Sequence, residues 1–285
     1  MYTIVDKRRL AEDIYLMDID APRIARSSQP GQFLIVRTHE QGERIPLTIC
    51  DYDTGKGIVT IVTQIVGASS RRICTKEKGE FMLDVMGPLG HPSEFIHLSK
   101  EELHRQRYLF IAGGVGAAPV YPQVKWLHEQ GAIADVIIGA KNVGMVILEE
   151  EMRKISNEVF ITTDDGTAGT KGLVTDKLKA LLAEGKQYTH IIAIGPMVMM
   201  KFVALAVKDS GIPLTVSLNT LMVDGTGMCG ACRVSVGGKT KFACVDGPEF
   251  DGYAVDFDEA MRRQTMYKTM ELDADHKCRI GLDEK

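Results

Sequence analysis

The chain has 285 residues, of which 45% are hydrophobic and 25% charged, and its formal net charge is −4. This length and apolar content suffice for two domains with separate cores. The mixed charge without a basic stripe argues against nucleic-acid binding, and no apolar run is long enough to span a membrane. The N-terminus lacks the apolar region and cleavage pattern of a signal peptide. We therefore expect a cytoplasmic protein that binds neither nucleic acid nor membrane.

Residues 1–98 are predicted to form an antiparallel β-barrel. Short segments rich in β-branched and aromatic residues are bounded by Gly, Pro or Asp, which is typical of strands separated by turns. They cover residues 2–10, 14–20, 31–39, 45–53, 57–66 and 81–90. Such closely spaced short strands favour a small barrel. One short helix is expected to start near Ser69.

Residues 99–222 change to an alternation of buried strands and amphipathic helices. The expected strands cover residues 107–116, 134–140, 157–166, 189–195 and 214–219. The expected helices cover residues 118–131, 173–185 and 197–211. This alternation predicts a parallel, doubly wound, Rossmann-like sheet, so the fold class is α/β plus a β-barrel.

The rest of the chain divides into a short Gly- and Cys-rich segment, residues 223–250, and a tail, residues 251–285. The first segment is too short to bury a core of its own. Residues 233–244 are expected to form a hairpin that returns the last cysteine toward the first ones. The tail is charged and partly helical in pattern, and we expect it to dock on the body of the protein or on a partner.

Three of the six cysteines lie close together in the segment 223–250. Cys229 and Cys232 are spaced C-x2-C, and Cys244 follows. Clustered cysteines in a large chain without a secretory signal bind metal more often than they form disulfides. Thiolates are ligands of both iron–sulfur clusters and zinc, and the surrounding glycines allow the positive φ angles that such loops need. The pattern predicts an iron–sulfur cluster, with zinc as the alternative.

A fourth ligand is needed, and Asp224 is the candidate. Plant-type ferredoxin loops carry a cysteine five residues before the C-x2-C pair, and Asp224 stands there. The alternative is a plain Asp-Gly turn, and Cys278 is a distant rival ligand. Cys50 and Cys74 are interpreted as small buried residues of the barrel.

Two further segments are candidates for binding phosphate groups. Gly113, Gly114 and Gly116 directly follow an expected strand and precede a helix, where a pyrophosphate can approach the backbone, although a tight turn also explains them. Gly67, followed by Ser69 and Ser70, offers amides and hydroxyls at a helix start, although a simple N-cap explains these residues equally well.

The order of motifs along the chain resembles the ferredoxin–NADP reductase superfamily. RIPLT, VGASS, GPLG, AGGVGAAP and GPMVMM are followed by the cysteine cluster. Within that superfamily the chain is most similar to the iron–sulfur electron-transfer subunits of dihydroorotate dehydrogenase and of NADH-dependent ferredoxin:NADP oxidoreductase. The dihydroorotate branch has four cysteines, so Asp224 favours the ferredoxin:NADP type, which resembles this chain in using an aspartate ligand.

The resemblance implies FAD in the barrel, a [2Fe–2S] cluster and a nicotinamide nucleotide. It assigns the flavin to Arg44, Pro46, Leu47, Thr48, Val62, Thr63 and Gln64, and its pyrophosphate to Gly67, Ser69 and Ser70. It assigns the nucleotide to Gly113, Gly114, Gly116, Ala117, Pro119, Gly195, Pro196 and Met197. The ligand set expected for the cluster is Asp224, Cys229, Cys232 and Cys244.

The expected chemistry is hydride exchange between nucleotide and flavin, followed by single-electron transfer through the cluster. Hydride transfer needs no general acid or base, so no catalytic residue is predicted. Asp164 and Asp165 follow an expected strand, where carboxylates suit a free ribose. They favour NAD(H), while Lys141 keeps NADP(H) open.

The resemblance also implies a larger partner subunit with a second flavin and [4Fe–4S] clusters. Ferredoxin would be reached through that subunit, in a complex capable of electron bifurcation. One alternative is the electron-transfer subunit of an NAD-dependent dihydroorotate dehydrogenase. The other is a zinc-stapled nucleotide-binding sensor or scaffold without redox activity.

Overall fold

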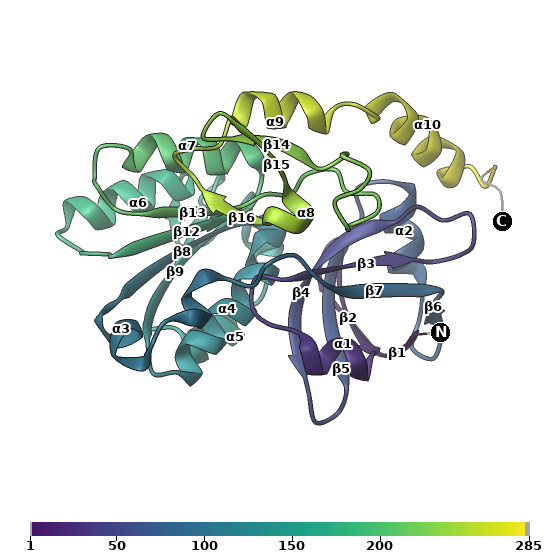
Figure 1. The fold of residues 1–285 in the computed structure, drawn as a ribbon, viewed down its shortest axis with the longest axis horizontal. Helices are drawn as coiled ribbons and strands as arrows, with labels where there is room; N and C mark the ends of the chain where they lie inside the picture. Colours follow the sequence, from purple (N-terminus) through teal and green to yellow (C-terminus); the bar gives the residue numbers. More distant parts are fainter. Residues whose placement is uncertain (1, 283–285) are drawn as a thin grey trace.

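The computed structural model describes residues 2–282, and Figure 1 shows two folded halves side by side, with the C-terminal segment along the top. The first half is an antiparallel sheet in the order β6-β1-β2-β5-β4-β3-β7 that curls into a nearly closed barrel. Its strands are β1 (Tyr2–Ala11), β2 (Ile14–Asp20), β3 (Phe33–Arg37), β4 (Ile45–Asp53), β5 (Ile58–Gln64), β6 (Phe81–Met82) and β7 (Asp84–Leu89).

The predicted barrel is confirmed, with one correction in its last segment. Residues 81–90 form two strands, because β6 pairs with β1 at one edge of the sheet and β7 pairs with β3 at the other. The predicted helix near Ser69 is α2 (Ala68–Thr75). The short helices that were not predicted include α1 (Pro22–Ser27) and α3 (Lys100–Arg105), because six residues are too few to show a helical period.

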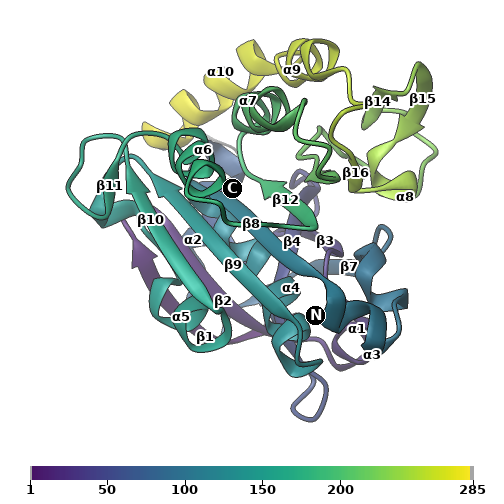
Figure 2. The ribbon, with the colours of Figure 1, turned by 90° about the vertical axis from the view of Figure 1, so that its left-hand side faces the viewer.

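The second half is a seven-stranded sheet in the order β11-β10-β9-β8-β12-β13-β16 (Figure 2). Its strands run parallel except for β16 at the edge. They are β8 (Arg107–Gly113), β9 (Ile133–Ala140), β10 (Glu158–Thr163), β11 (Thr170–Lys171), β12 (His190–Ile194), β13 (Leu214–Ser217) and β16 (Glu249–Asp251). The predicted doubly wound sheet is confirmed.

Strand β8 shows why helices cover both faces of this sheet. Leu109 and Ile111 pack in one core with residues of α6 (Val174–Ala183) and α7 (Met197–Val207). Phe110 lies in a second core with residues of α4 (Ala117–Glu129) and α5 (Glu149–Ile155). Successive side chains of a strand point to opposite faces, so an all-apolar strand must be covered twice. Single-turn 3₁₀ helices lie at Glu94–His97 (η1), Gly114–Gly116 (η2) and Val143–Met145 (η3).

The segment after β13 is attached to the seven-stranded sheet of the second half. The predicted hairpin is β14 (Arg233–Val236) and β15 (Lys239–Phe242), followed by α8 (Ala243–Asp246) and then β16, which pairs with β13. Cys232, Val234 and Cys244 belong to the same buried core as α7. The segment therefore has no separate core, and the predicted boundaries between the four parts of the chain stay a prediction.

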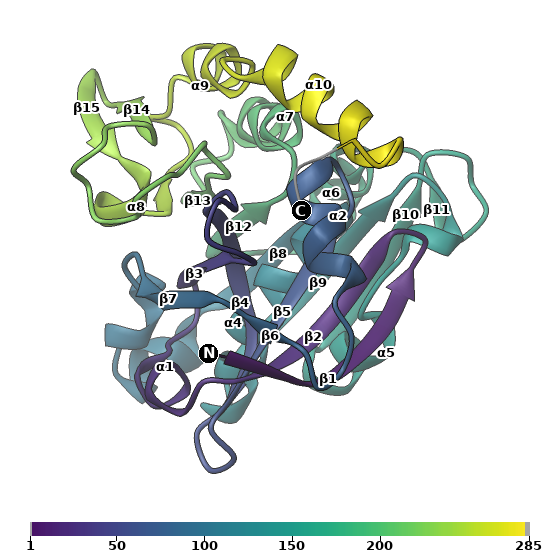
Figure 3. The same ribbon diagram turned by 90° about the vertical axis from the view of Figure 1, so that its right-hand side faces the viewer.

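The tail forms α9 (Phe257–Gln264) and α10 (Lys268–Arg279), and it docks on the body of the protein. Helix α10 packs against α2 of the barrel (Figure 3), and Arg71 Nη2 lies 3.3 Å from Asp275 Oδ1. None of the helices described within residues 2–282 has the length and apolar character needed to cross a bilayer.

Candidate functional site

The loop between β13 and β14 is organised by the carboxylate of Asp224. Its Oδ1 accepts a hydrogen bond from Thr226 N at 2.7 Å, and its Oδ2 accepts one from Cys229 N at 2.9 Å. Hydrogen bonds with Cys229 and then Thr226 hold the pKa of this carboxyl well below its usual range. The Asp-Gly turn that the sequence left open is therefore present, and Asp224 also reaches the side chain of Cys229.

The other two cysteines of the predicted set form a buried pair. The hairpin returns the chain so that Cys244, on α8, has its Sγ 3.2 Å from Cys232 Sγ. Burial, and next the hydrogen bond with Cys232, raise the pKa of Cys244 to about 12. A bound cation would reverse this effect, because metals bind the thiolate.

The four donors thus lie as two pairs, Asp224 with Cys229 and Cys232 with Cys244. Within residues 2–282, no three His, Cys, Asp or Glu side chains are grouped as the ligands of one metal ion. Zinc needs four donors around one point, whereas a two-iron cluster has two metal ions that share four protein ligands. The donor set fits a [2Fe–2S] cluster better than a single zinc ion.

The remaining cysteines lie elsewhere. Cys50 and Cys74 are buried, and burial raises the pKa of Cys74 to about 12. Both therefore agree with their interpretation as small core residues. Cys278 lies on α10, which packs against α2.

The residues predicted to hold a flavin gather on neighbouring barrel strands. Pro46, Leu47 and Thr48 lie on β4 opposite residues of β3, and Val62, Thr63 and Gln64 end β5, which leads to α2. The buried hydroxyl of Thr63 has no hydrogen-bond partner among the described residues. A Cβ built on Gly67, at the start of α2, would meet no atom within 4 Å. An orphaned hydroxyl and an open helix start fit a cofactor with polar and phosphate groups.

Three of the flavin candidates have partners within the chain. Ser70 Oγ accepts hydrogen bonds from Val66 N at 2.8 Å and Gly67 N at 3.0 Å. This hydroxyl therefore caps backbone amides at the start of α2, as in the alternative interpretation of the sequence. Ser69 Oγ donates to Glu43. The guanidinium of Arg44 donates to backbone carbonyls of the cluster loop, a contact that no local pattern predicted.

The residues predicted to hold the nucleotide meet where β8 and β12 end side by side. A Cβ on Gly116 would lie 2.1 Å from Ile194 O, and one on Gly195 would lie 3.0 Å from Gly113 Cα. Gly114 has φ +55° and a Cβ there would meet open space. Glycines thus bring the strand ends together and expose backbone at the point where the strand order reverses, which is where open α/β sheets bind ligands.

The other nucleotide candidates surround the same edge. Ala117 and Pro119 lie in the first turn of α4, Pro196 caps α7, and Met197 begins it. Asp164 and Asp165 follow β10.

The two aspartates after β10 differ in their surroundings. Asp165 Oδ1 accepts from Thr167 N at 3.0 Å, and Thr167 Oγ1 accepts from Val143 N at 2.9 Å. The hydrogen bonds from Thr167 lower the pKa of Asp165. Asp165 therefore positions Thr167, which ties the loop after β10 to the loop after β9, while Asp164 is exposed beside it.

Sequence reasoning missed a polar junction between the two halves and the segment after the hairpin. Glu249 Oε1, on β16, accepts from Ser93 Oγ at 2.9 Å and from Gln123 Nε2, on α4, at 2.9 Å. Burial raises the pKa of Glu249 to about 7. A single sequence offers no signal for this junction, because its three residues belong to separate elements.

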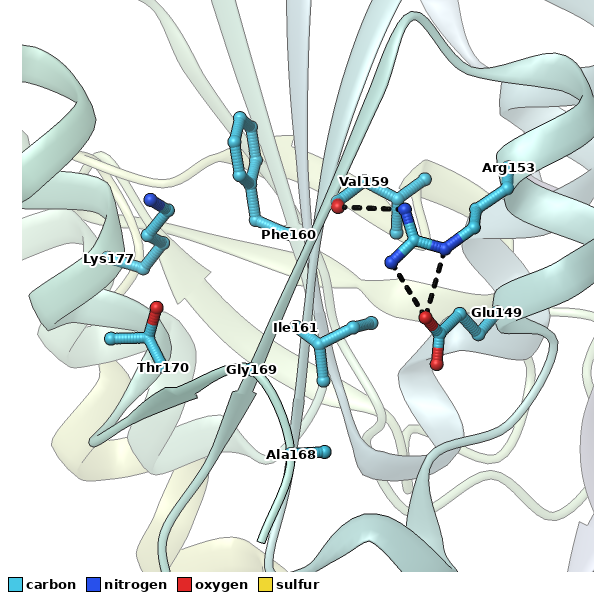
Figure 4. Close-up of a pocket in the computed structure, with 9 residues that line it drawn as sticks. All are labelled: Glu149, Arg153, Val159, Phe160, Ile161, Ala168, Gly169, Thr170 and Lys177. Atoms are coloured by element: carbon cyan, nitrogen blue, oxygen red, sulfur yellow. Dashed lines mark hydrogen bonds and ion pairs between the residues drawn. The ribbon is translucent and has the colours of Figure 1, made fainter. Parts of the chain in front are cut away.

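A shallow pocket of about 300 Å³ lies against β10, on the side of the sheet away from β8 (Figure 4). On one side of it Arg153 Nη2 pairs with Glu149 Oε1 of the same helix, α5, at 2.7 Å, and on the other side Lys177 Nζ lies 4.7 Å from the ring centroid of Phe160. None of the predicted site residues lines this pocket.

Comparison with known families gives two matches within the chain. Residues 219–256 match the iron–sulfur cluster binding domain of dihydroorotate dehydrogenase B. Residues 110–205 match the oxidoreductase NAD-binding domain. The first match includes all four predicted cluster ligands, and the second includes the glycine loop after β8.

Similar proteins extend this likeness to nearly the whole chain. An uncharacterised protein of the adh 3′ region in Clostridium beijerinckii is 58% identical over 95% of this chain and 92% of its own. A Thermotoga maritima homologue of the electron transfer subunit of dihydroorotate dehydrogenase B (NAD(+)) is 44% identical, over 94% and 92%. The corresponding Fusobacterium nucleatum subunit is 33% identical, over 87% and 95%.

Comparison with solved structures extends the similarity from sequence to fold. A chain from the structure of NADH-dependent reduced ferredoxin–NADP oxidoreductase, described for flavin-based electron bifurcation, has a TM-score of 0.89 and 42% identity, and the match covers 97% of both chains. Phthalate dioxygenase reductase, at 17% identity and a TM-score of 0.59 over 90% and 97% of the two chains, shares the fold. The chain belongs to the family of electron-transfer subunits of dihydroorotate dehydrogenase B and their homologues, within the ferredoxin–NADP reductase superfamily.

Proposed function

We propose that this chain is the small electron-transfer subunit of an NADH-dependent ferredoxin:NADP oxidoreductase, carrying FAD and a [2Fe–2S] cluster. The observation that carries the proposal is the arrangement of Asp224, Cys229, Cys232 and Cys244 as two donor pairs, with Asp224 on a loop that contacts the barrel. Asp224 in place of a fourth cysteine favours this type over the dihydroorotate dehydrogenase subunit, which is the second candidate.

Bound FAD would exchange a hydride with the nicotinamide and single electrons with the cluster. The chain's own residues bind and orient. The barrel strands and the start of α2 would hold the flavin, and the glycine loop after β8, together with residues 195–197, would hold the nucleotide. The protein thereby places the reacting groups next to one another, and it needs no acid or base for the transfer.

NAD(H) is the nucleotide that the carboxylates favour. Asp164 and Asp165 follow β10, next to the end of β9, where the ribose of a dinucleotide is recognised. A carboxylate accepts hydrogen bonds from a free 2′-hydroxyl and repels a 2′-phosphate. Stopped-flow reduction of the purified protein tests this assignment: NADH should reduce the flavin faster than NADPH, and faster reduction by NADPH would refute it.

The proposal includes a larger partner subunit with a second flavin and [4Fe–4S] clusters, through which ferredoxin is reached and where bifurcation takes place. It also includes a cytoplasmic location, where thiolate ligands stay reduced. Affinity purification of the native complex tests the partner. Recovery of a large iron–sulfur flavoprotein with ferredoxin:NADP activity supports the proposal, whereas recovery of a dihydroorotate dehydrogenase favours the second candidate. The isolated chain should reduce dyes with NADH but not ferredoxin.

A further inference from the structure

Arg44 connects the barrel to the cluster loop. It lies immediately before β4, the strand that carries Pro46–Thr48, and its side chain is half-buried. Its Nε donates to Val223 O at 2.7 Å, and its Nη2 donates to Asp224 O at 3.2 Å. One rigid guanidinium therefore holds two consecutive carbonyls of the loop, and a planar fork of donors is well suited to this task.

A second contact, independent of Arg44, holds the same loop on the barrel. Gly225 has φ +78° and is buried. A Cβ built there would lie 2.7 Å from Ile35 Cδ1 on β3 and 2.9 Å from Leu89 Cδ1 on β7. The backbone at Gly225 is therefore in close contact with the barrel wall. Together these contacts restrain the residues on both sides of Asp224.

We propose that Arg44 is a positioning residue that couples the cluster to the flavin. It fixes the backbone of Asp224 against the start of the strand proposed to bind flavin, and so it sets the separation between the two cofactors. This rests on the proposed function for the identity of the cofactors, but the docking of the loop by Arg44 can be measured without any redox assay. Arg44 contributes through geometry and also through charge.

The two contributions are separable. Hydrogen bonds from the guanidinium restrain the loop, and lysine cannot bridge both carbonyls in the same way. The positive charge beside Asp224 stabilises the added electron on a reduced cluster, and lysine keeps that charge. Arg44→Lys should therefore loosen the loop while largely keeping the cluster potential, and Arg44→Gln should loosen the loop and also lower the potential.

The test is amide hydrogen exchange of residues 222–228 in the purified holoprotein, with FAD content and the cluster potential measured on the same samples. Arg37→Lys is the matched control, because Arg37 is also a barrel arginine that donates to a backbone carbonyl, that of Glu40, at 2.9 Å. Both Arg44 variants should exchange about tenfold faster in this loop, since each lost hydrogen bond contributes roughly a factor of ten, and the control should match the wild type there.

Electron transfer from flavin to cluster should slow in the Arg44 variants relative to the wild type and to the Arg37→Lys control. Loss of FAD from the Arg44 variants without faster exchange in the loop would overturn the proposal and assign Arg44 to the flavin alone. Equal exchange in wild type and variants would also overturn it. A wild-type protein that lacks a cluster would instead refute the proposed function, and its loop exchange would still report on the docking by Arg44.

Discussion

Glu249 provides a quantitative test of how the halves are joined. Its carboxyl group is enclosed by Ser93 and Gln123, although the residue keeps some exposure. Burial, and to a smaller extent the charge of Glu94, raise its pKa from 4.5 to about 7 against the opposing hydrogen bonds with Ser93 and Gln123. The folded protein therefore holds a proton that the unfolded chain has lost between pH 4.5 and 7. The free energy of unfolding falls as the pH rises through this window. Above pH 7 the buried carboxyl group is ionised, and the full cost of burying its charge is present.

Glu249→Gln removes that penalty. An amide keeps an oxygen for Ser93, and it adds a donor next to Gln123, whose Oε1 is buried without a partner among the described residues. With a folded pKa of about 7, the variant should be more stable than wild type by at most about 2 kcal/mol at pH 6 and about 3 kcal/mol at pH 8.5. Residual exposure reduces both values, because water screens the charge.

Urea unfolding of both proteins at the two pH values measures this difference. Glu12→Gln is the control, because Glu12 is exposed in the turn between β1 and β2, where a substitution should change the free energy of unfolding little. If the difference in free energy of unfolding between Glu249→Gln and the wild type stays constant or shrinks from pH 6 to pH 8.5, the account of a buried carboxyl with a raised pKa is refuted.

Three further substitutions test the sites. Gly116→Ala should lower the free energy of unfolding by about 1–3 kcal/mol in a urea titration, because its Cβ would lie 2.1 Å from Ile194 O; wild-type stability would contradict the close approach of β8 and β12. Gly67→Ala should leave stability nearly unchanged, since its Cβ meets open space, but should weaken FAD binding about tenfold in an equilibrium titration; unchanged affinity would exclude a phosphate at that backbone. Asp224→Cys should change the visible and electron paramagnetic resonance spectra of the cluster, and identical spectra would contradict ligation by Asp224.

The main fold could be predicted because each half shows its periodicity locally. Strand β8 is apolar on both faces, which indicates a sheet covered by helices on both sides. The division of residues 81–90 into β6 and β7 could not be predicted, because it depends on which distant strand each part meets. Helix α5 was also missed, since Met152 is its only buried residue and an amphipathic period is not visible.

The site shows the same difference between local and distant information. The hairpin could be read from its glycines and β-branched residues, and it brings Cys244 to Cys232 as predicted. The contact between Arg44 and the carbonyl of Asp224 joins residues 180 positions apart and has no local signature. The junction at Glu249 is likewise formed by the tertiary fold.

The most direct test of the central claim is the cofactor content of the purified chain, determined by iron, sulfide and flavin analysis together with the visible spectrum. We predict two irons, two acid-labile sulfides and one FAD per chain, with flavin bands on a broad iron–sulfur envelope that NADH bleaches under anaerobic conditions. A colourless protein that contains zinc and no flavin would contradict the account.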